Sequence, residues 1–295
     1  MEITVVCVPF NGDVARWGCA QGPRAYLDAG LLERLRAGGH RVREPVWIDL
    51  PRSERTRDTV TNLGKIAERM AAAVAPGLRE PDSFVLVLEG DCTHAVGAIG
   101  GVAGAVGTPG VVWIDAHGDI NTRATSETGL WGGMPYAVAL GWDLDDWREA
   151  AGLEPAVPSA AAALLGTSDL DSAEVEAIKR HDIAHLEARA MQQGRVAEKV
   201  VDLLAPRASQ VPGWYVHLDV DVAGPEEVPG GLTPAPYYPS REQLLEAVAA
   251  IPQSVNVRAM GVAAYNPNGD PERRGARFGV EMACTLIERV GAGST

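Results

Sequence analysis

Trp113-Ile114-Asp115-Ala116-His117-Gly118-Asp119 is the stretch that decides the fold, because three polar side chains follow an apolar run at alternate positions. The run, residues 110–114, is typical of a buried strand. Side chains of an extended chain alternate between its two faces, so Asp115, His117 and Asp119 are expected to point the same way. Oxygen and nitrogen donors that converge at a strand end are suited to divalent cations.

A second stretch, Trp214-Tyr215-Val216-His217-Leu218-Asp219-Val220-Asp221, repeats the arrangement with Asp219 and Asp221. A single Asp-x-Asp at a strand end is more often a cap for the following turn or helix. Two such stretches change that balance, because four clustered carboxylates without a cation would repel one another. The pair of stretches therefore favours a site for one or two divalent cations.

Composition limits the class of protein. The chain has 295 residues, of which 46% are hydrophobic, and it shows no linker, repeat or low-complexity segment, so we expect one domain over residues 1–295. A net charge of −13 argues against nucleic-acid binding, which needs a cationic face. No apolar run approaches the roughly 20 residues that span a bilayer, so no membrane contact is expected.

The cysteines indicate the compartment. They are widely spaced, without a zinc-finger or CxxC pattern, and the N-terminus has no signal-peptide pattern. We therefore expect reduced thiols in a cytoplasmic protein. The four are Cys7, Cys19, Cys92 and Cys284.

Short apolar runs alternate with helical stretches along the chain, which predicts a parallel sheet covered by helices on both faces. Ligands of such α/β sheets bind beyond the carboxyl ends of the strands, where both acidic stretches fall. The predicted strands are 3–9, 83–88, 111–115, 161–165, 214–219 and 257–262. The predicted helices are 23–37, 59–75, 93–106, 172–180, 185–204, 240–251 and 274–290, with a helix and a loop within 143–159.

Five motifs in order resemble the arginase/agmatinase superfamily, the ureohydrolases, over nearly the whole chain. The resemblance implies a three-layer α/β/α sandwich with a mostly parallel central sheet. The motifs are Gly22-Pro23-Arg24 (family GP-x-R), Leu88-Glu89-Gly90-Asp91-Cys92-Thr93 (GGDHS), Asp115-Ala116-His117-Gly118-Asp119-Ile120-Asn121-Thr122 (DAHxDxNT), His217-Leu218-Asp219-Val220-Asp221-Val222 (SxDxD) and Asn266-Pro267 (ExNP).

The resemblance also implies a binuclear manganese site. Asp115 and Asp219 would bridge two Mn²⁺ ions, and a metal-bound hydroxide would attack the guanidinium carbon. Asp119 and His117 are assigned to catalysis as well as to metal binding. The implied ligands are Cys92, Asp115, Asp119 and Asp219 for one ion, and His117, Asp115, Asp219 and Asp221 for the other.

Substrate contacts follow from the same resemblance. Asn121 and Thr128 fall at or near positions that arginases use for the α-carboxylate of the substrate. Asp171 ends a segment similar to the family's GxRDxD, with Ser168 in place of the Arg, and would face the α-amino group. Capping of the predicted helix 172–180 is an equally weighted interpretation of Asp171.

Three departures from the family motifs concern the reacting group. Cys92 replaces a metal-binding His, and it is either a soft ligand that favours Zn²⁺ or a small buried residue that leaves one metal position weak. Gly132 replaces a His used in proton transfer. Ala264 replaces the Glu that pairs with the guanidinium; Asp270 and Glu281 are nearby candidates to substitute for it.

The Cys92 and Gly132 replacements, with the local run at residues 128–134, resemble the hydroxyarginine-hydrolase branch of D-cycloserine biosynthesis. That branch hydrolyses Nω-hydroxy-L-arginine, whose hydroxyguanidine has a lower pKa than a guanidine and so needs a proton shuttle less. The resemblance to this branch does not explain the loss of the Glu at Ala264. We therefore expect a hydrolase of linear amidines acting on a small guanidino or hydroxyguanidino compound, and a homo-oligomer, trimer or hexamer.

The alternative is an arginase-fold protein that has lost guanidine hydrolysis and is metal-binding, regulatory or repurposed for another reaction. The three departures support it. Two histidines are assigned structural roles in either case. His94 is expected in the first turn of a helix, and His217 in the core beneath the metal ligands.

Overall fold

A parallel sheet forms the centre of the computed structural model, which describes residues 1–231 and 233–292. Within these residues nine strands pair in the order β4-β1-β6-β11-β10-β7-β8-β9, with β5 also on β1, and every pairing in this sheet is parallel. The strands are β1 (Glu2–Val8), β4 (Arg41–Val42), β5 (Val46–Trp47), β6 (Ser83–Glu89), β7 (Gly110–Ile114), β8 (Ala162–Leu165), β9 (Ala184–Leu186), β10 (Trp214–Asp219) and β11 (Val257–Ala263). A separate antiparallel hairpin joins β2 (Phe10–Asn11) to β3 (Val14–Ala15).

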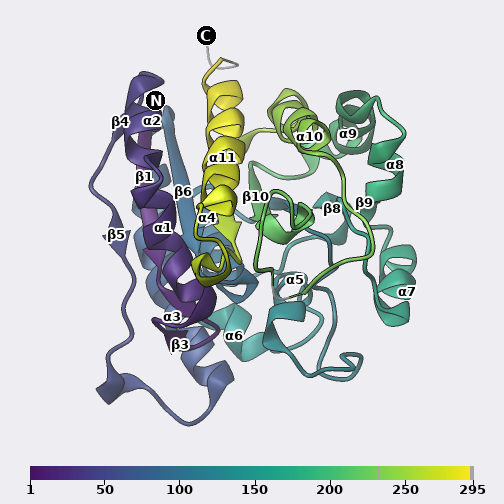
Figure 1. Cartoon of the computed structure of the whole chain (residues 1–295). Coiled ribbons are helices and arrows are strands. Elements are labelled where there is room, and N and C mark those ends of the chain that lie inside the picture. Colours follow the sequence, from purple (N-terminus) through teal and green to yellow (C-terminus); the bar gives the residue numbers. More distant parts are fainter. Residues whose placement is uncertain (232, 293–295) are drawn as a thin grey trace.

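Helices cover both faces of this sheet (Figure 1). One face packs against α1, α2, α8, α9, α10 and α11, and the other against α3, α4, α5 and α7. The helices are α1 (Gly22–Asp28), α2 (Leu31–Ala37), α3 (Thr59–Val74), α4 (Ala95–Val106), α5 (Pro135–Ala139), α6 (Asp145–Ala150), α7 (Ser172–Arg180), α8 (Ala188–Gln192), α9 (Val196–Leu204), α10 (Arg241–Ser254) and α11 (Arg274–Ala292).

Successive side chains of each strand point to opposite faces of the sheet, and each face has its own hydrophobic core. In β6, Phe84, Leu86 and Leu88 belong to one core, while Val85 and Val87 belong to the other. The alternation follows from the two-residue period of an extended chain, and burial on both faces is typical of parallel sheets. The predicted three-layer α/β/α fold is confirmed.

Two predicted helices are wrong in detail. Residues 23–37 form two helices, because Gly30 adopts a left-handed φ of 86° between α1 and α2. Residues 185–204 contain the edge strand β9 followed by α8 and α9, with left-handed φ values at Gly194 and Arg195 separating the helices. The short strands β4 and β5 carry no recognisable pattern and were not predicted.

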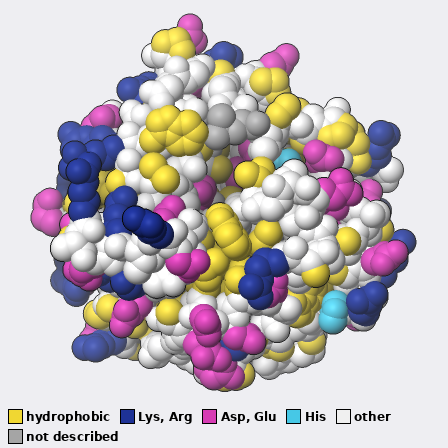
Figure 2. Space-filling view, turned by 90° about the horizontal axis from the view of Figure 1, so that it is seen from below, with side chains coloured by type: hydrophobic (Ala, Val, Ile, Leu, Met, Phe, Trp, Pro, Cys, Tyr) yellow, Lys and Arg dark blue, Asp and Glu magenta, His cyan; other side chains and the backbone are white. Residues whose placement is uncertain are grey.

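The sheet order determines where the motifs meet. Because β6, β11, β10 and β7 are neighbours and parallel, the segments after each of them lie along one edge of the sheet. The strand β1 starts at the labelled N-terminus at the top of Figure 1, so the carboxyl ends point downward in that view. Figure 2 shows this lower face, with hydrophobic side chains near its centre and acidic and basic side chains around them. Among the described residues, no helix has the length and apolarity to cross a membrane.

Candidate metal centre

The segment after β7 bends so that its acidic side chains face one another. Asp115 is buried, and its Oδ1 accepts a hydrogen bond from the His117 backbone N–H at 2.8 Å. Asp119 has a left-handed φ of 52°, and its carbonyl accepts hydrogen bonds from the backbone N–H groups of Tyr136 and Ala137 at the start of α5. A non-glycine residue in that conformation needs such support. Contacts with α5 therefore hold the reversal that brings Asp119 back towards Asp115.

The end of β10 supplies the second acidic pair. Asp219 Oδ1 accepts a hydrogen bond from the Asp221 backbone N–H at 2.7 Å, and Asp221 Oδ2 accepts one from the Thr233 hydroxyl at 2.8 Å. His117 Nδ1 lies 3.2 Å from Asp115 Oδ1 and 3.3 Å from Asp221 Oδ2. The imidazole thus links the two strand ends.

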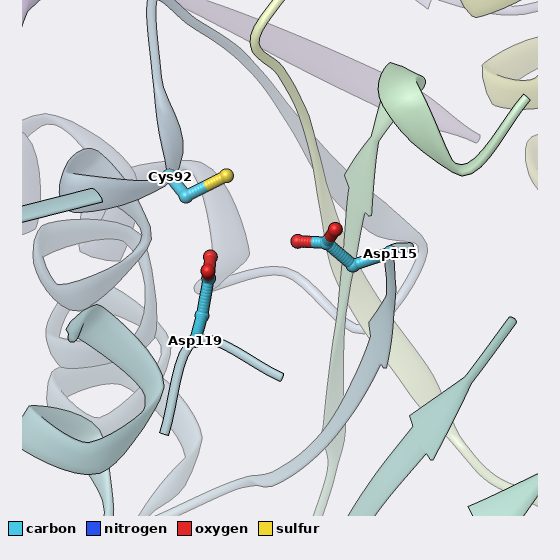
Figure 3. Close-up of side chains that lie close together, drawn as sticks. All are labelled: Cys92, Asp115 and Asp119. Atoms are coloured by element: carbon cyan, nitrogen blue, oxygen red, sulfur yellow. The ribbon is translucent and has the colours of Figure 1, made fainter. Parts of the chain in front are cut away.

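Cys92 enters the cluster from the turn that follows β6. Its Sγ lies 2.9 Å from Asp219 Oδ2, to which the thiol donates a hydrogen bond. Ligand atoms of Cys92, Asp115 and Asp119 lie within 4.8 Å of one another. Figure 3 shows the three side chains directed into one shared space.

A second group with metal-ligand spacing adjoins the first. Ligand atoms of Asp115, His117 and Asp221 also lie within 4.8 Å of one another, so Asp115 belongs to both groups. Asp119 Oδ2 and Asp221 Oδ1 are buried without a hydrogen-bond partner in the described structure. Two adjacent cation positions that share a carboxylate would use these oxygens.

The electrostatics of the cluster also fit cations. Burial, followed by repulsion from neighbouring carboxylates, raises the pKa values of Asp115, Asp119 and Asp219 above the usual range. Burial lowers the pKa of His117, but hydrogen bonds to Asp115 and Asp221 outweigh it, so the pKa is raised. The protein alone therefore concentrates negative charge that protons or metal ions must offset. The oxygen-rich donor set suits hard divalent ions, with one nitrogen and one sulfur alongside.

Two of the three predicted substrate-binding residues lie together beside this cluster. Asn121 Nδ2 donates a hydrogen bond to Asp171 Oδ2 at 2.8 Å, and the Thr125 hydroxyl donates one to Asn121 Oδ1 at 2.9 Å. Asp171 is also the N-cap residue of α7, so capping and substrate contact are geometrically compatible. Thr128 is exposed, and among the described contacts its hydroxyl meets the backbone N–H of Leu130 rather than Asn121 or Asp171.

The three departures lie in different surroundings. Cys92 is buried among carboxylates, and burial is the main cause that raises the pKa of its thiol well above the usual value. A Cβ on Gly132 would meet no heavy atom within 4 Å in the described structure, so a larger side chain has room there. Ala264 has a left-handed φ of 66°, and its carbonyl accepts a hydrogen bond from the Cys19 thiol at 3.3 Å.

Both candidates to replace the missing Glu are engaged elsewhere. Asp270 Oδ2 accepts hydrogen bonds from the Tyr265 hydroxyl at 2.9 Å and from the Gly275 backbone N–H at 2.8 Å at the start of α11. Glu281 is paired with Arg241, with distances of 2.6 and 2.8 Å. Both carboxylates thus have protein partners, while Asp270 Oδ1 is buried without a hydrogen-bond partner among the described residues.

Sequence reasoning missed a carboxylate that holds the loop after β7. Glu174 in α7 is buried and accepts hydrogen bonds from the backbone N–H groups of Ile120 (3.2 Å) and Asp171 (3.0 Å). Burial raises its pKa to about 7. The spacing of Asp171 and Glu174 is that of a capping box, a pattern visible in the sequence. That pattern does not reveal the contact with Ile120, which is distant along the chain.

The two histidines given structural roles contact the frame of the site. His94 belongs to the turn Cys92–His94, and its Nε2 lies 3.1 Å from the Gly12 carbonyl oxygen. His217 is fully buried in β10, with its ring stacked on Trp113 at 3.8 Å between centroids. Neither belongs to the two groups with metal-ligand spacing among the described residues.

Comparison with known proteins agrees with this geometry. The arginase of Bacillus subtilis (strain 168) is 30% identical over 292 residues, covering 97% of each chain. The arginase of Brevibacillus brevis is 32% identical over 237 residues, covering 79% of this chain and 80% of its own. A crystal structure of arginase from Bacillus subtilis superposes with a TM-score of 0.87 at 27% identity, covering 97% of this chain and 98% of that one. The family model described as the arginase family matches residues 1–288, and the chain therefore belongs to the arginase family.

Proposed function

We propose that this protein is a metal-dependent hydrolase that cleaves a C–N bond of a guanidino or hydroxyguanidino compound. The observation that carries the proposal is the convergence of donor atoms into two groups that share Asp115. Membership of the arginase family supports the same class of reaction. The proposed ligands are Cys92, Asp115, His117, Asp119, Asp219 and Asp221, and the proposed cofactor is two Mn²⁺ ions.

The proposed roles follow from the arrangement of these side chains. When bound, divalent cations would lower the pKa of a water so that it is nucleophilic at neutral pH, and would orient it towards the substrate carbon. Asp119 would hold a cation through its unpartnered Oδ2, and its carboxylate is also assigned to hydrogen-bond the attacking water and accept a proton from it. His117 is assigned to bind metal as the neutral imidazole, which requires loss of the proton that Asp115 and Asp221 favour in the metal-free protein.

A hydroxyguanidine is the preferred head group in this proposal. No side chain at Gly132 can carry a proton to the leaving amine, and a hydroxyguanidine, being less basic, needs that transfer less. Ala264 provides no carboxylate, and Asp270 and Glu281 are held elsewhere. The charge-assisted contact that a Glu at residue 264 would make to a planar cation is therefore absent, which also favours a less basic head group. Nω-Hydroxy-L-arginine, cleaved to ornithine and hydroxyurea, has this chemistry.

The other end of the substrate is assigned to the polar network beside the metal centre. Asn121 and Thr128 would contact an α-carboxylate, and Asp171 an α-amino group. The hydrogen bond between Asn121 and Asp171 supports a common subsite for these two residues. An amino-acid substrate is expected from this arrangement, because a free ammonium and carboxylate can pair with it.

Turnover assays test the proposal. Protein loaded with Mn²⁺ is incubated with Nω-hydroxy-L-arginine, L-arginine and agmatine, and hydroxyurea, urea and ornithine or putrescine are quantified. We expect hydroxyurea release with the highest kcat/KM, and its loss in Asp115→Asn. Absence of product from all three compounds in protein that retains metal would refute the proposal.

The second candidate is a protein of this fold that no longer hydrolyses guanidines, favoured by the three departures at Cys92, Gly132 and Ala264. The variant Cys92→His/Gly132→His/Ala264→Glu distinguishes the two. If the triple variant hydrolyses arginine while the parent hydrolyses none of the compounds, the second candidate is correct. If the parent hydrolyses Nω-hydroxy-L-arginine, it is excluded.

A homo-oligomer, trimer or hexamer, is part of the proposal because the family resemblance implies it. Light scattering coupled to size-exclusion chromatography measures the mass directly. Multiples of three of the 31.1 kDa chain are expected. A monomer at micromolar concentration would contradict this part alone.

A further inference from the structure

Two ionisable side chains lie one layer beneath the metal ligands and have no role in the proposed reaction. Glu89 ends β6 and His217 lies within β10, and both are fully buried. Glu89 Oε2 lies 3.3 Å from His217 Nδ1, and Glu89 Oε1 accepts a hydrogen bond from the Tyr215 hydroxyl at 2.9 Å. Glu89 Oε2 and both ring nitrogens of His217 have no hydrogen-bond partner among the described residues, so the close approach of the carboxylate to the imidazole is an electrostatic contact rather than a hydrogen bond.

The strand between them is shaped to make the contact possible. β11 separates β6 from β10, and Gly261 faces the pair. A Cβ at Gly261 would lie 2.0 Å from the Tyr215 hydroxyl oxygen and 2.8 Å from Glu89 Oε1. Only glycine therefore leaves room for this polar cluster in the middle of the sheet.

Both Glu89 and His217 stand where the family motifs have a small residue. Glu89 stands at the first Gly of the segment similar to GGDHS, and His217 stands at the Ser of the segment similar to SxDxD. Two small positions thus carry large ionisable side chains, and these two touch each other across a third strand. A role in folding alone would not require polar groups here, because apolar side chains fill such a space at lower cost.

A ring stack connects this pair to a metal ligand. The His217 ring lies on Trp113 at 3.8 Å with an interplanar angle of 25°, and Trp113 lies on Tyr136 at 4.8 Å and 9°. The Tyr136 hydroxyl donates to the Val111 carbonyl and accepts from the backbone N–H of Ala163, which holds that ring in place. The Trp113 indole, held between two rings, donates its N–H to Asp115 Oδ2 at 3.1 Å.

We propose that Glu89 and His217 are positioning residues for the metal centre, acting through Trp113 on the carboxylate of Asp115. Glu89 fixes the imidazole, the imidazole fixes the indole, and the indole orients the carboxylate that both metal groups share. Mutation of a residue that orients a metal ligand in this way commonly lowers metal affinity by about 10- to 100-fold. The inference rests on the proposed metal-dependent function, but it concerns the affinity for metal rather than the substrate.

The test measures Mn²⁺ affinity by titration calorimetry and, separately, thermal unfolding of the protein in EDTA. Trp113→Phe keeps a ring between His217 and Tyr136 but removes the indole N–H that donates to Asp115. His217→Ser removes the imidazole ring that stacks on Trp113. We expect each to weaken Mn²⁺ binding about tenfold or more, and the double variant to be no weaker than the weaker single variant, because both changes break one chain of contacts. Glu89→Gln, which keeps the size of the side chain, supplies the same measurement if His217→Ser does not fold.

Trp214→Phe is the matched control, because Trp214 is a buried indole in β10, the strand of His217, and it packs on the opposite face of the sheet from Trp113. It is expected to lower the unfolding temperature in EDTA and to leave Mn²⁺ affinity within about twofold of the parent. The proposal is overturned if Trp113→Phe and Glu89→Gln also bind Mn²⁺ within about twofold of the parent, or if the losses in the double variant add. Metal affinity is measured without turnover. Failure of this inference can therefore be told apart from failure of the proposed reaction in a substrate screen.

Discussion

The two sides of the candidate site differ in how closely they follow the family motifs. The side formed by the ends of β7 and β10 has all four acidic residues and His117, brought together by the neighbouring parallel strands and by the reversal at Asp119 rather than by strand alternation alone. The side expected to meet the reacting group differs at Cys92, Gly132 and Ala264. The comparison shows that the strand ends keep the residues of the family motifs, while the positions expected to meet the head group differ.

Removing the shared carboxylate tests the retained side most severely. Asp115→Asn is expected to abolish binding at both metal groups and to lower kcat/KM by at least about 10³-fold, or about 4 kcal/mol. Asp202→Asn, an exposed change in α9, is the control and should leave both quantities unchanged. Full activity in Asp115→Asn would mean that the retained side is not the catalytic centre.

The stability of the metal-free protein should depend on pH through Glu174. Burial raises its pKa from about 4.5 to about 7, so the folded state holds a proton that the unfolded state releases in that window. The contribution to stability is fully present below pH 4.5 and is lost as pH rises through 7, by as much as about 3 kcal/mol.

Urea denaturation in EDTA at pH 5 and pH 8 measures this loss. Glu174→Gln should reduce the difference between the two pH values. The raised pKa values of Asp115, Asp119 and Asp219 also make the metal-free protein less stable as pH rises, so part of the difference should remain in Glu174→Gln. A difference of unchanged size in Glu174→Gln would exclude Glu174 as a source.

Ala264→Glu restores the missing carboxylate on the divergent side. We expect the ratio of kcat/KM for L-arginine to that for Nω-hydroxy-L-arginine to rise about tenfold, because a charge-assisted hydrogen bond to the more basic head group is gained. Ala264→Gln has nearly the same size without the charge and should not change the ratio. If both variants shift the ratio equally, charge is not what distinguishes the substrates.

Cys92→His is expected to give the smallest effect, a several-fold shift in affinity from Zn²⁺ towards Mn²⁺, because a nitrogen ligand replaces a soft sulfur. Competition between the two ions, followed by elemental analysis, measures the shift. Cys284→Ser, at a buried thiol of α11, is the control. An unchanged preference together with stronger binding of both ions would favour the interpretation of Cys92 as a weakened position.

The sequence was sufficient for the parts of the site that follow from local periodicity. Asp115, His117, Asp219 and Asp221 come together because they occupy strand ends in a parallel sheet, which the alternating apolar pattern predicts. Glu174 was missed because its contact with Ile120 joins segments that no short-range pattern relates.

Longer-range contacts explain the other omissions. The contact between Glu89 and His217 depends on the order of three strands and on a glycine between them. That order is set by the packing of the whole sheet. The break at Gly30 and the edge strand β9 were missed because flanking helix-favouring residues dominate both windows.

Metal stoichiometry tests the central claim most directly. Protein is reconstituted with excess Mn²⁺, unbound ion is removed, and bound manganese is quantified by elemental mass spectrometry. The convergence of two donor groups on Asp115 predicts close to two ions per chain, falling to none in Asp115→Asn. Fewer than one ion per chain in the folded parent would contradict a binuclear hydrolase.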